Sequence, residues 1–221
     1  MPERAPEVTR LVLVRHGESQ VSVERTIGGP KSCTGLSELG RRQVGALRDR
    51  LARTREMEAD VLLASTLPRA VETAEILAPA LGGLEIEQVE DLSELQPGEC
   101  DGMRWEEFVE RYRPDGWTFD PYEPLSPGGE SLADFQLRAG RALHQIARAL
   151  AGRTIVAACH GGIIDSSFVA LLGVPHGRND MSHPINASIT EWELHADVQV
   201  AGRPPQWRLA RYNDAAHLAD V

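Results

Sequence analysis

The chain has 221 residues, of which 42% are hydrophobic and 25% charged, and it carries a formal net charge of −10 at pH 7. Such a composition is typical of a globular protein with a sizeable core, and the length suits one domain that spans residues 1–221. Because a body of this charge repels nucleic acid and anionic membranes, we expect neither as a partner. A small anion can still bind in a local cationic pocket.

Two further features bear on the cellular compartment. We expect no membrane association, because the sequence shows no apolar run of signal-peptide or transmembrane length. The three cysteines, Cys33, Cys100 and Cys159, are too few and too scattered for a disulfide framework or a zinc site. We therefore expect a reduced protein of the cytoplasm.

The first part of the chain alternates short apolar runs with helical patterns. Buried strands are predicted over 10–14 ("RLVLV") and 60–65 ("DVLLAS"), and a third strand over 84–89. A helix is predicted over 36–53, where apolar residues recur at helical spacing. A second helix is predicted over 67–81, with a proline in its first turn.

The second part of the chain continues the alternation. A long amphipathic helix is predicted over 130–150, with a capping box formed by Ser131 and Asp134. A wholly apolar strand is predicted over 154–160. It runs into a predicted helix over 161–173 that begins on two glycines.

Two alternating segments, 188–194 and 206–212, predict a terminal pair of strands. The order of elements indicates an α/β fold, a three-layer α/β/α sandwich around a largely parallel sheet. In such sheets ligands bind beyond the carboxyl ends of the strands. Arg15 and His16 follow one predicted strand and His160 follows another, so we expect these side chains to meet in one cleft.

The segment 97–127 differs from the rest of the chain. It is rich in proline and glycine, and it holds more than half of the tryptophan, tyrosine and phenylalanine residues. We expect this insertion to form a small cap over the cleft. Its aromatic side chains should form mainly a small satellite core, with one or two facing the cleft. These residues are Trp105, Phe108, Tyr112, Trp117, Phe119 and Tyr122.

Five motifs occur in order along nearly the whole chain: "VRHGES", "STLPRAVETA", "LSELQPGECDGM", "GGES" and "ACHGG". Together they resemble the motifs of the histidine phosphatase superfamily, the phosphoglycerate-mutase-like proteins, in its phosphatase branch. The resemblance implies a phosphoglycerate-mutase-like fold. It also implies hydrolysis of a small phosphorylated metabolite through a phosphohistidine, with no metal and no cofactor.

The residue types suit this chemistry. Hydrolysis of a phosphate monoester is extremely slow in water, and a covalent intermediate on a neutral imidazole nitrogen divides it into two easier steps. His16 would be the nucleophile. Arg15 and Arg69 carry planar guanidinium groups that match phosphoryl oxygens, and His160 would add a further donor. The guanidinium groups should also lower the pKa of His16 and keep its ring neutral.

Four further residues are candidates for binding phosphate or substrate. Gly17 and Gly161 lack a Cβ atom, so the backbone can approach the anion closely. Ser22 stands where relatives often carry an asparagine that contacts phosphate, and its hydroxyl can still donate one hydrogen bond. Arg25 matches, more loosely, a region that lines the pocket in relatives.

The departing alkoxide needs a proton. In "LSELQPGE" the carboxyl group that matches the family's general acid is that of Glu94. It would protonate the leaving oxygen and then act as a base toward water. Glu99 and Asp101 are nearby alternatives that the sequence leaves open.

Two other functions stay open, namely a phosphoglycerate mutase that uses a bisphosphate primer and an inert phosphoryl-binding protein. A mutase must hold a second anionic group, so its cap should present cations. Residues 104–127 instead hold three arginines against six acidic residues. This balance favours a phosphatase whose substrate has an apolar or aromatic alcohol. The oligomeric state is also open, with a homodimer as one option.

The remaining histidines show no pairing at metal-ligand spacing, and we expect packing or surface roles for them. We likewise expect a structural role for the segment "PIN" that follows one of them. These histidines are His144, His176, His195 and His217, and for His183, which precedes "PIN", a place in the pocket is the alternative.

Overall fold

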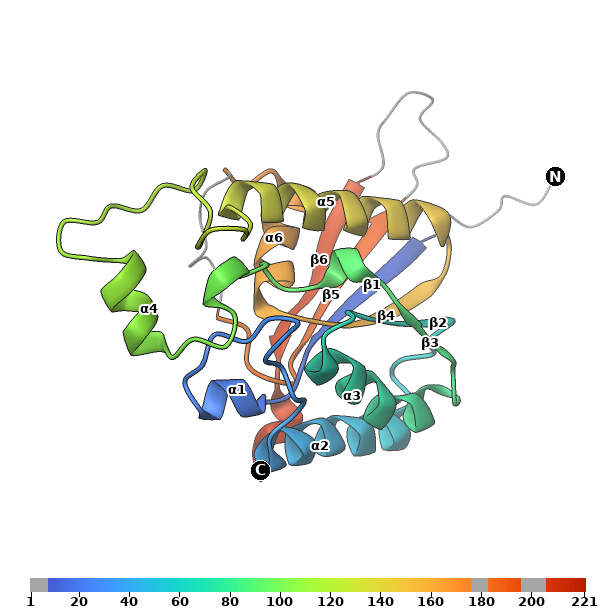
Figure 1. Cartoon of the computed structure of the whole chain (residues 1–221). Helices are drawn as coiled ribbons and strands as arrows, with labels where there is room; N and C mark the ends of the chain where they lie inside the picture. The colour runs from blue at the N-terminus through green and yellow to red at the C-terminus, as the bar shows by residue number, and fades with distance from the viewer. Residues whose placement is uncertain (1–7, 176–182, 196–205) are drawn as a thin grey trace.

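The computed structural model describes residues 8–175, 183–195 and 206–221 (Figure 1). Its six strands form one sheet in the order β3-β2-β4-β1-β5-β6. Neighbouring strands run parallel from β3 to β1, whereas β5 is antiparallel to both β1 and β6. The sheet is therefore largely parallel, as the sequence predicted. The strands are β1 Val8–Arg15, β2 Val61–Ala64, β3 Ile86–Gln88, β4 Thr154–Cys159, β5 Ile189–His195 and β6 Gln206–Asp214.

Helices cover both faces of the sheet, α2 and α3 on one side and α5 and α6 on the other (Figure 1). Within the described ranges, none of the helices combines the length and the apolar character needed to cross a bilayer. The α-helices are α1 Gln20–Val23, α2 Glu38–Thr54, α3 Pro68–Leu77, α4 Trp105–Tyr112, α5 Leu132–Ala149 and α6 Gly161–Leu172. The 3₁₀ helices are η1 Ala78–Leu81, η2 Glu90–Leu92, η3 Gly98–Cys100 and η4 Ala216–Leu218.

The apolar run of β1 is continuous because both faces of the strand are buried. Val12 and Val14 pack in the cluster that contains the side chains of α2 and α3. Leu11 and Leu13 alternate with them and pack in the second cluster, with α5 and α6. Since successive side chains of a strand point to opposite faces, one strand serves two cores. This arrangement is the predicted three-layer sandwich.

The helix predicted over 67–81 is shorter as an α-helix than the sequence pattern indicated. The α-helix ends at Leu77 and the chain continues as the 3₁₀ helix η1. Pro79 has no amide hydrogen to continue the α-helical ladder, which explains the change. Gly82 then ends the segment with a φ of 79°.

The cap segment 97–127 carries α4 and projects to one side of the sheet (Figure 1). The expected satellite core is limited to Phe108 and its neighbours, because Trp105, Trp117, Phe119 and Tyr122 are exposed. Phe108 is buried, and its ring centroid lies 5.4 Å from that of Trp105 and 5.7 Å from that of Tyr112. The guanidinium of Arg113 lies over the Trp117 ring, 4.2 Å from its centroid.

The start of α2 packs directly on the loop that follows β1. A Cβ atom on Gly17 would lie 2.5 Å from the carbonyl oxygen of Gly40. One on Gly40 would lie 2.1 Å from the carbonyl oxygen of Glu18. The two backbones therefore touch, and only residues without a side chain permit this approach.

We predict that Gly40→Ala lowers the free energy of unfolding by about 1–3 kcal/mol, because the new methyl group overpacks a backbone contact. Gly45 is a matched control in the same helix, since a Cβ there would meet nothing within 4 Å. Gly45→Ala should raise stability by about 0.5–1 kcal/mol through helix propensity. Urea titration of both variants checks this, and equal effects of one sign would contradict the proposed contact.

Candidate active site

His16 follows the last residue of β1 and is 5% exposed. Its Nδ1 lies 2.6 Å from the carbonyl oxygen of Gly17. Since a carbonyl can only accept, Nδ1 carries the proton and Nε2 keeps a free lone pair. The side-chain amide of Asn186 donates to the carbonyl oxygen of His16 at 3.0 Å and fixes the backbone at this point. The ring is therefore set in the tautomer that a nucleophile needs.

Arg69 lies in the first turn of α3 and is 4% exposed. Its Nε donates both to Nε2 of His16 at 3.1 Å and to Nδ1 of His160 at 3.3 Å. The two imidazole rings lie edge to face, with centroids 5.1 Å apart. Nη1 of Arg69 donates to the carbonyl oxygen of Gly28 at 3.1 Å, which fixes the guanidinium plane.

His160 follows β4 and is the N-cap residue of α6. Its Nε2 lies 2.8 Å from the hydroxyl oxygen of Ser65, which follows β2. Because Nδ1 accepts from Arg69, Nε2 carries the proton and donates to Ser65. Strands β1, β4 and β2 are parallel neighbours, so the residues that follow them, His16, His160 and Ser65, meet at one edge of the sheet.

Arg15 supplies a second guanidinium at the same edge. Its Nη1 donates to the carbonyl oxygen of Pro184, in the segment that precedes β5. Its Nε is buried without a hydrogen-bond partner. An unpartnered donor on a buried cation is costly, and an anion in the cavity can relieve that cost.

Arg15, His16 and Arg69 line one cavity of about 280 Å³, whereas His160 lies behind Arg69 and is not among the lining residues. One wall carries Arg15, His16 and Arg69, and the remaining wall is largely apolar or uncharged, apart from Glu94. None of the cap aromatics among the described residues lines this cavity, so the expectation that one or two would face it was wrong. Most of them contact a neighbouring cap ring, and Tyr122 is exposed. The lining residues are Arg15, His16, Ser19, Val21, Ser22, Thr26, Ile27, Gly28, Arg69, Glu94, Leu95, Pro97 and Leu125.

Burial lowers the pKa of His16 well below its ordinary value of 6.5, and the Arg69 and Arg15 charges lower it further. The hydrogen bond to Gly17 acts in the opposite direction but is outweighed. Burial and the Arg69 charge lower the pKa of His160 in the same way. Both rings are therefore neutral at pH 7, and the Nε2 atom of His16 is available as a nucleophile.

Glu94 lies on the cavity wall in the loop between η2 and η3. Its Oε2 accepts from the backbone amide of Gly162 at 3.1 Å, at the start of α6. A Cβ atom on Gly162 would lie 2.2 Å from Oε1 of Glu94 and 2.8 Å from the Phe135 ring. The second glycine of "ACHGG" therefore leaves the space that the carboxyl group occupies.

The geometry separates Glu94 from the two alternatives that the sequence left open. The carboxylate of Asp101 accepts from the backbone amides of Gly29 and Lys31, at 3.0 and 2.9 Å, and thereby holds the loop that these residues form. Asp101 and Glu99 line a separate hollow and not the cavity of His16. Of the three carboxyl groups, that of Glu94 is the one that lines the same cavity as His16.

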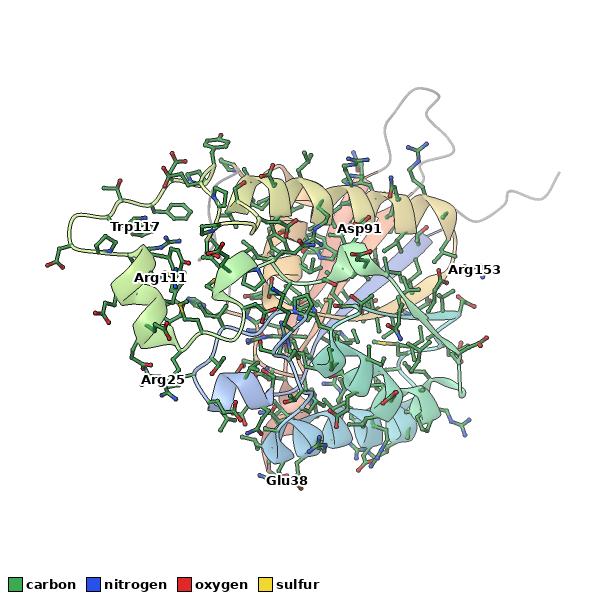
Figure 2. The ribbon with its side chains drawn as sticks, in the orientation of Figure 1. Arg25, Glu38, Asp91, Arg111, Trp117 and Arg153 are labelled. Carbon is green, nitrogen blue, oxygen red and sulfur yellow. The ribbon has the colours of Figure 1, made fainter. Side chains whose placement is uncertain are left out.

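Of the other candidate residues, some lie at the site and one does not. Gly17 and Gly161 lie directly after the two strands, and Ser22 lines the cavity with its hydroxyl 2.8 Å from that of Ser19. Arg25 is not brought into the cavity. Its side chain is 67% exposed, and its guanidinium pairs with Glu106 of α4 at 3.1 Å at the outer surface of the molecule (Figure 2).

Sequence reasoning did not single out Ser65 or Asn186 as site residues. Ser65 begins the motif "STLPRAVETA" and follows a strand at the same sheet edge as His16, which was a usable signal. Asn186 belongs to the segment "PIN", which was expected to be structural. Its role is to hold the backbone of His16, and that contact spans 170 positions of sequence.

Two of the remaining histidines make local contacts outside the cavity lining. Nδ1 of His144 pairs with the carbonyl oxygen of Gly140 at 2.9 Å, and His195 pairs with Glu193 at 2.8 Å. Across the described part of the chain, no three or more histidine, cysteine, aspartate or glutamate side chains gather as a metal site. His176 lies outside the described residues.

A neutral imidazole flanked by two guanidinium groups, at the carboxyl edge of an α/β sheet, defines a phosphoryl-transfer site. A family model of the histidine phosphatase superfamily (branch 1) matches residues 11–205. The chain therefore belongs to the histidine phosphatase superfamily. The resemblance seen in the sequence is confirmed.

Similar proteins include several phosphatases. A metal-independent phosphoserine phosphatase of Arabidopsis thaliana is 29% identical over 219 residues, which cover 97% of this chain and 85% of that protein. Phosphoserine phosphatase 1 of Hydrogenobacter thermophilus is 32% identical over 76% of this chain and 78% of that protein. The vanadate complex of a mycobacterial glucosyl-3-phosphoglycerate phosphatase matches with a TM-score of 0.75 and 28% identity, over 92% of this chain and 98% of that one.

A phosphoglycerate mutase from Bacillus anthracis has the same fold, with a TM-score of 0.75 at 19% identity over 97% of this chain and 96% of that one. This likeness supports the expected phosphoglycerate-mutase-like α/β fold. At this identity the likeness concerns the fold alone. The phosphatase relatives and the family together support a phosphoric monoester hydrolase.

The lowered pKa values of His16 and His160 predict how stability depends on pH. Below pH 6.5 the unfolded chain takes up protons at these rings, whereas the folded protein does not. The free energy of unfolding should therefore fall as pH drops below 6.5, by up to about 1.4 kcal/mol per pH unit for each ring. Urea titrations between pH 5 and 7.5 test this. An unchanged slope in His160→Asn would contradict it.

Proposed function

We propose that this protein hydrolyses a small phosphomonoester through a phosphohistidine on His16. The observation that carries the proposal is the Arg69 guanidinium, which lies between Nε2 of His16 and Nδ1 of His160. A phosphoryl group seated there would draw the Arg69 hydrogen bonds to its oxygens and release the lone pair of His16. Arg15 would meet the remaining negative charge.

The first step forms the bond between Nε2 of His16 and phosphorus while the ester P–O bond breaks. The electron pair of that bond goes to the leaving oxygen, and Glu94 gives it a proton. In the second step the Glu94 carboxylate takes a proton from water, whose oxygen attacks phosphorus. The N–P bond breaks, its pair returns to Nε2, and the products are the alcohol and inorganic phosphate.

His160 would donate to the phosphoryl group from Nδ1 after a change of tautomer. Ser65 permits this change because a hydroxyl can either accept from Nε2 or donate to it. The Ser65 hydroxyl also lies 3.3 Å from that of Ser93, so it has a second partner in either state. The His160 ring can thus change tautomer when a phosphoryl group binds, and Ser65 keeps its hydrogen bonds in both states.

The lining of the cavity supports a phosphatase rather than a mutase. Arg15 and Arg69 are the cations among its lining residues, and both are used on the transferring phosphoryl group. Arg25, which would be the next cation along the chain, is paired with Glu106. The rest of the lining is largely apolar, with Val21, Ile27 and Leu95 among its members, beside the uncharged Ser19, Ser22 and Thr26. We infer that the leaving alcohol is apolar or aromatic and carries no second anionic group.

The proposal extends to the compartment. Cys33, Cys100 and Cys159 are free thiols, and all three are buried. A reducing compartment keeps thiols in this form, so we propose a cytoplasmic location.

We predict that His16→Ala lowers kcat for an aryl phosphate by several orders of magnitude, because the covalent route is lost. Quenching the wild type with ³²P-labelled substrate in alkaline detergent should trap an acid-labile, base-stable phosphoprotein that the variant lacks. Activity should persist in a chelator, since the steps above use protein groups throughout. A wild type that is inactive and unlabelled would favour the inert phosphoryl-binding protein.

A panel of substrates tests the apolar wall. We predict that kcat/KM is higher for phosphate esters of neutral apolar or aromatic alcohols than for esters that carry a second phosphate or a carboxylate. The physical reason is that Arg15 and Arg69, the cations of the lining, both bind the transferring phosphoryl group, so none is left to bind a second anionic group. Ile27→Lys should raise relative activity toward doubly anionic esters. Clear preference of the wild type for a sugar bisphosphate would contradict the inferred substrate class.

A further inference from the structure

Arg138, in the middle of α5, binds the loop that carries Glu94. Its side chain is mostly buried, and its guanidinium donates to three backbone carbonyl groups. Nη1 donates to the carbonyl oxygens of Asp91 and Ser93, at 2.8 and 3.1 Å, and Nη2 donates to that of Glu94 at 3.4 Å. Figure 2 shows Asp91 just beneath α5, in η2.

Glu130 completes the arrangement from the other side of the loop. Its carboxylate accepts from Nε and Nη2 of Arg138 at 2.8 and 2.7 Å, a bidentate pair. The same carboxylate accepts from the backbone amide of Gln96 at 3.0 Å, and the amide of Glu130 donates to the carbonyl oxygen of Gln96 at 2.9 Å. Backbone groups on both sides of Glu94 are therefore held by one ion pair.

Arg138 and Glu130 act beside other contacts on this loop, since the Gly162 amide donates to the Glu94 carboxylate and the Ser126 hydroxyl donates to the carbonyl oxygen of Pro97. Residues 94–97 belong to no helix or strand, so their backbone makes no regular ladder of hydrogen bonds. Arginine suits the task because five donors in a rigid plane can bind carbonyl groups and a carboxylate together. The Arg138 guanidinium also lies over the Phe135 ring, 5.2 Å from its centroid, and that ring faces the space beside Gly162 where the Glu94 carboxyl group sits.

The ion pair also accounts for "GGES", the motif to which the steps proposed above give no role. Glu130 is the glutamate of that motif, and Ser131 caps α5 by accepting from the amide of Asp134 at 3.1 Å. The cap fixes where α5 begins, and Arg138 lies eight residues beyond Glu130 on that helix. The motif therefore sets the ion pair under the loop of Glu94.

We propose that Arg138 and Glu130 are positioning residues that hold the Glu94 carboxyl group at the leaving oxygen. This proposal rests on the proposed function, in which Glu94 is the general acid. A carboxyl group must lie within hydrogen-bond reach of the oxygen that it protonates, and a displacement of about 1 Å can cost about 100-fold in rate.

The test uses the acidity of the leaving alcohol. Esters of acidic phenols need little proton transfer, whereas alkyl esters depend on the general acid. In Arg138→Met we expect kcat/KM to fall about 100-fold for an alkyl phosphate and less than about threefold for 4-nitrophenyl phosphate. Glu130→Gln should show the same selective loss to a smaller extent, because its amide oxygen can still accept from Gln96. Arg141, which is exposed on the same helix, gives a matched control, and Arg141→Met should change neither rate.

A double variant and phosphohistidine labelling distinguish a positioning role of Arg138 from a purely structural one. If Arg138 acts through Glu94, then adding Arg138→Met to Glu94→Gln should cause no further selective loss. An equal loss on all esters, or no loss, would overturn the positioning role while the wild type still forms phosphohistidine. If Arg138→Met does not fold, the same comparison in Glu130→Gln decides. A wild type that neither hydrolyses these esters nor forms phosphohistidine would overturn the proposed function and this proposal with it.

Discussion

One hydrogen bond donor, the Nε of Arg69, organises the whole site. It is shared between two buried imidazoles at 3.1 and 3.3 Å, and the sharing requires that both rings are neutral. Burial and the guanidinium charges make the protonated rings unfavourable, so charge, tautomer and geometry agree. The two lone pairs are thus turned toward the Arg69 guanidinium. The rest of the fold must bring the chain segments that follow β1, β2 and β4 to this guanidinium.

The topology of the sheet brings these segments together, and glycines allow them to approach closely. Parallel neighbours β1, β4 and β2 end at one edge, and the segment before β5 reaches back over it through Pro184 and Asn186. At Gly17 and Gly162 the absence of a side chain lets backbone or a carboxyl group approach closely. Each of these contacts joins residues far apart in the chain, so the site is a product of the complete fold.

The fold was predictable because its signals are local. The apolar run of β1, the helical spacing in α2 and the capping serine of α5 each lie within a few residues, and all three elements form where expected. The rule for strand ends also predicted that His16 and His160 would meet. Contacts between distant segments were not predictable in the same way. The pairing of Arg25 with Glu106 depends on where α4 comes to lie, and the hold of Arg138 on the loop of Glu94 spans more than forty residues.

The attachment of α4 has a consequence for how such a pocket can diversify. Ile27 exchanges backbone hydrogen bonds with Gly102 and Met103, and Thr26 forms a bridge with Arg104, while Thr26 and Ile27 also line the cavity. The cap is therefore joined to the cavity wall by a short antiparallel pairing of residues 26–27 with residues 102–104. Changes on the outer surface of α4 can shift the wall by tilting this pair of segments, without altering any residue that meets the ligand. Selectivity can thus drift through surface substitutions while the phosphoryl-binding groups stay constant.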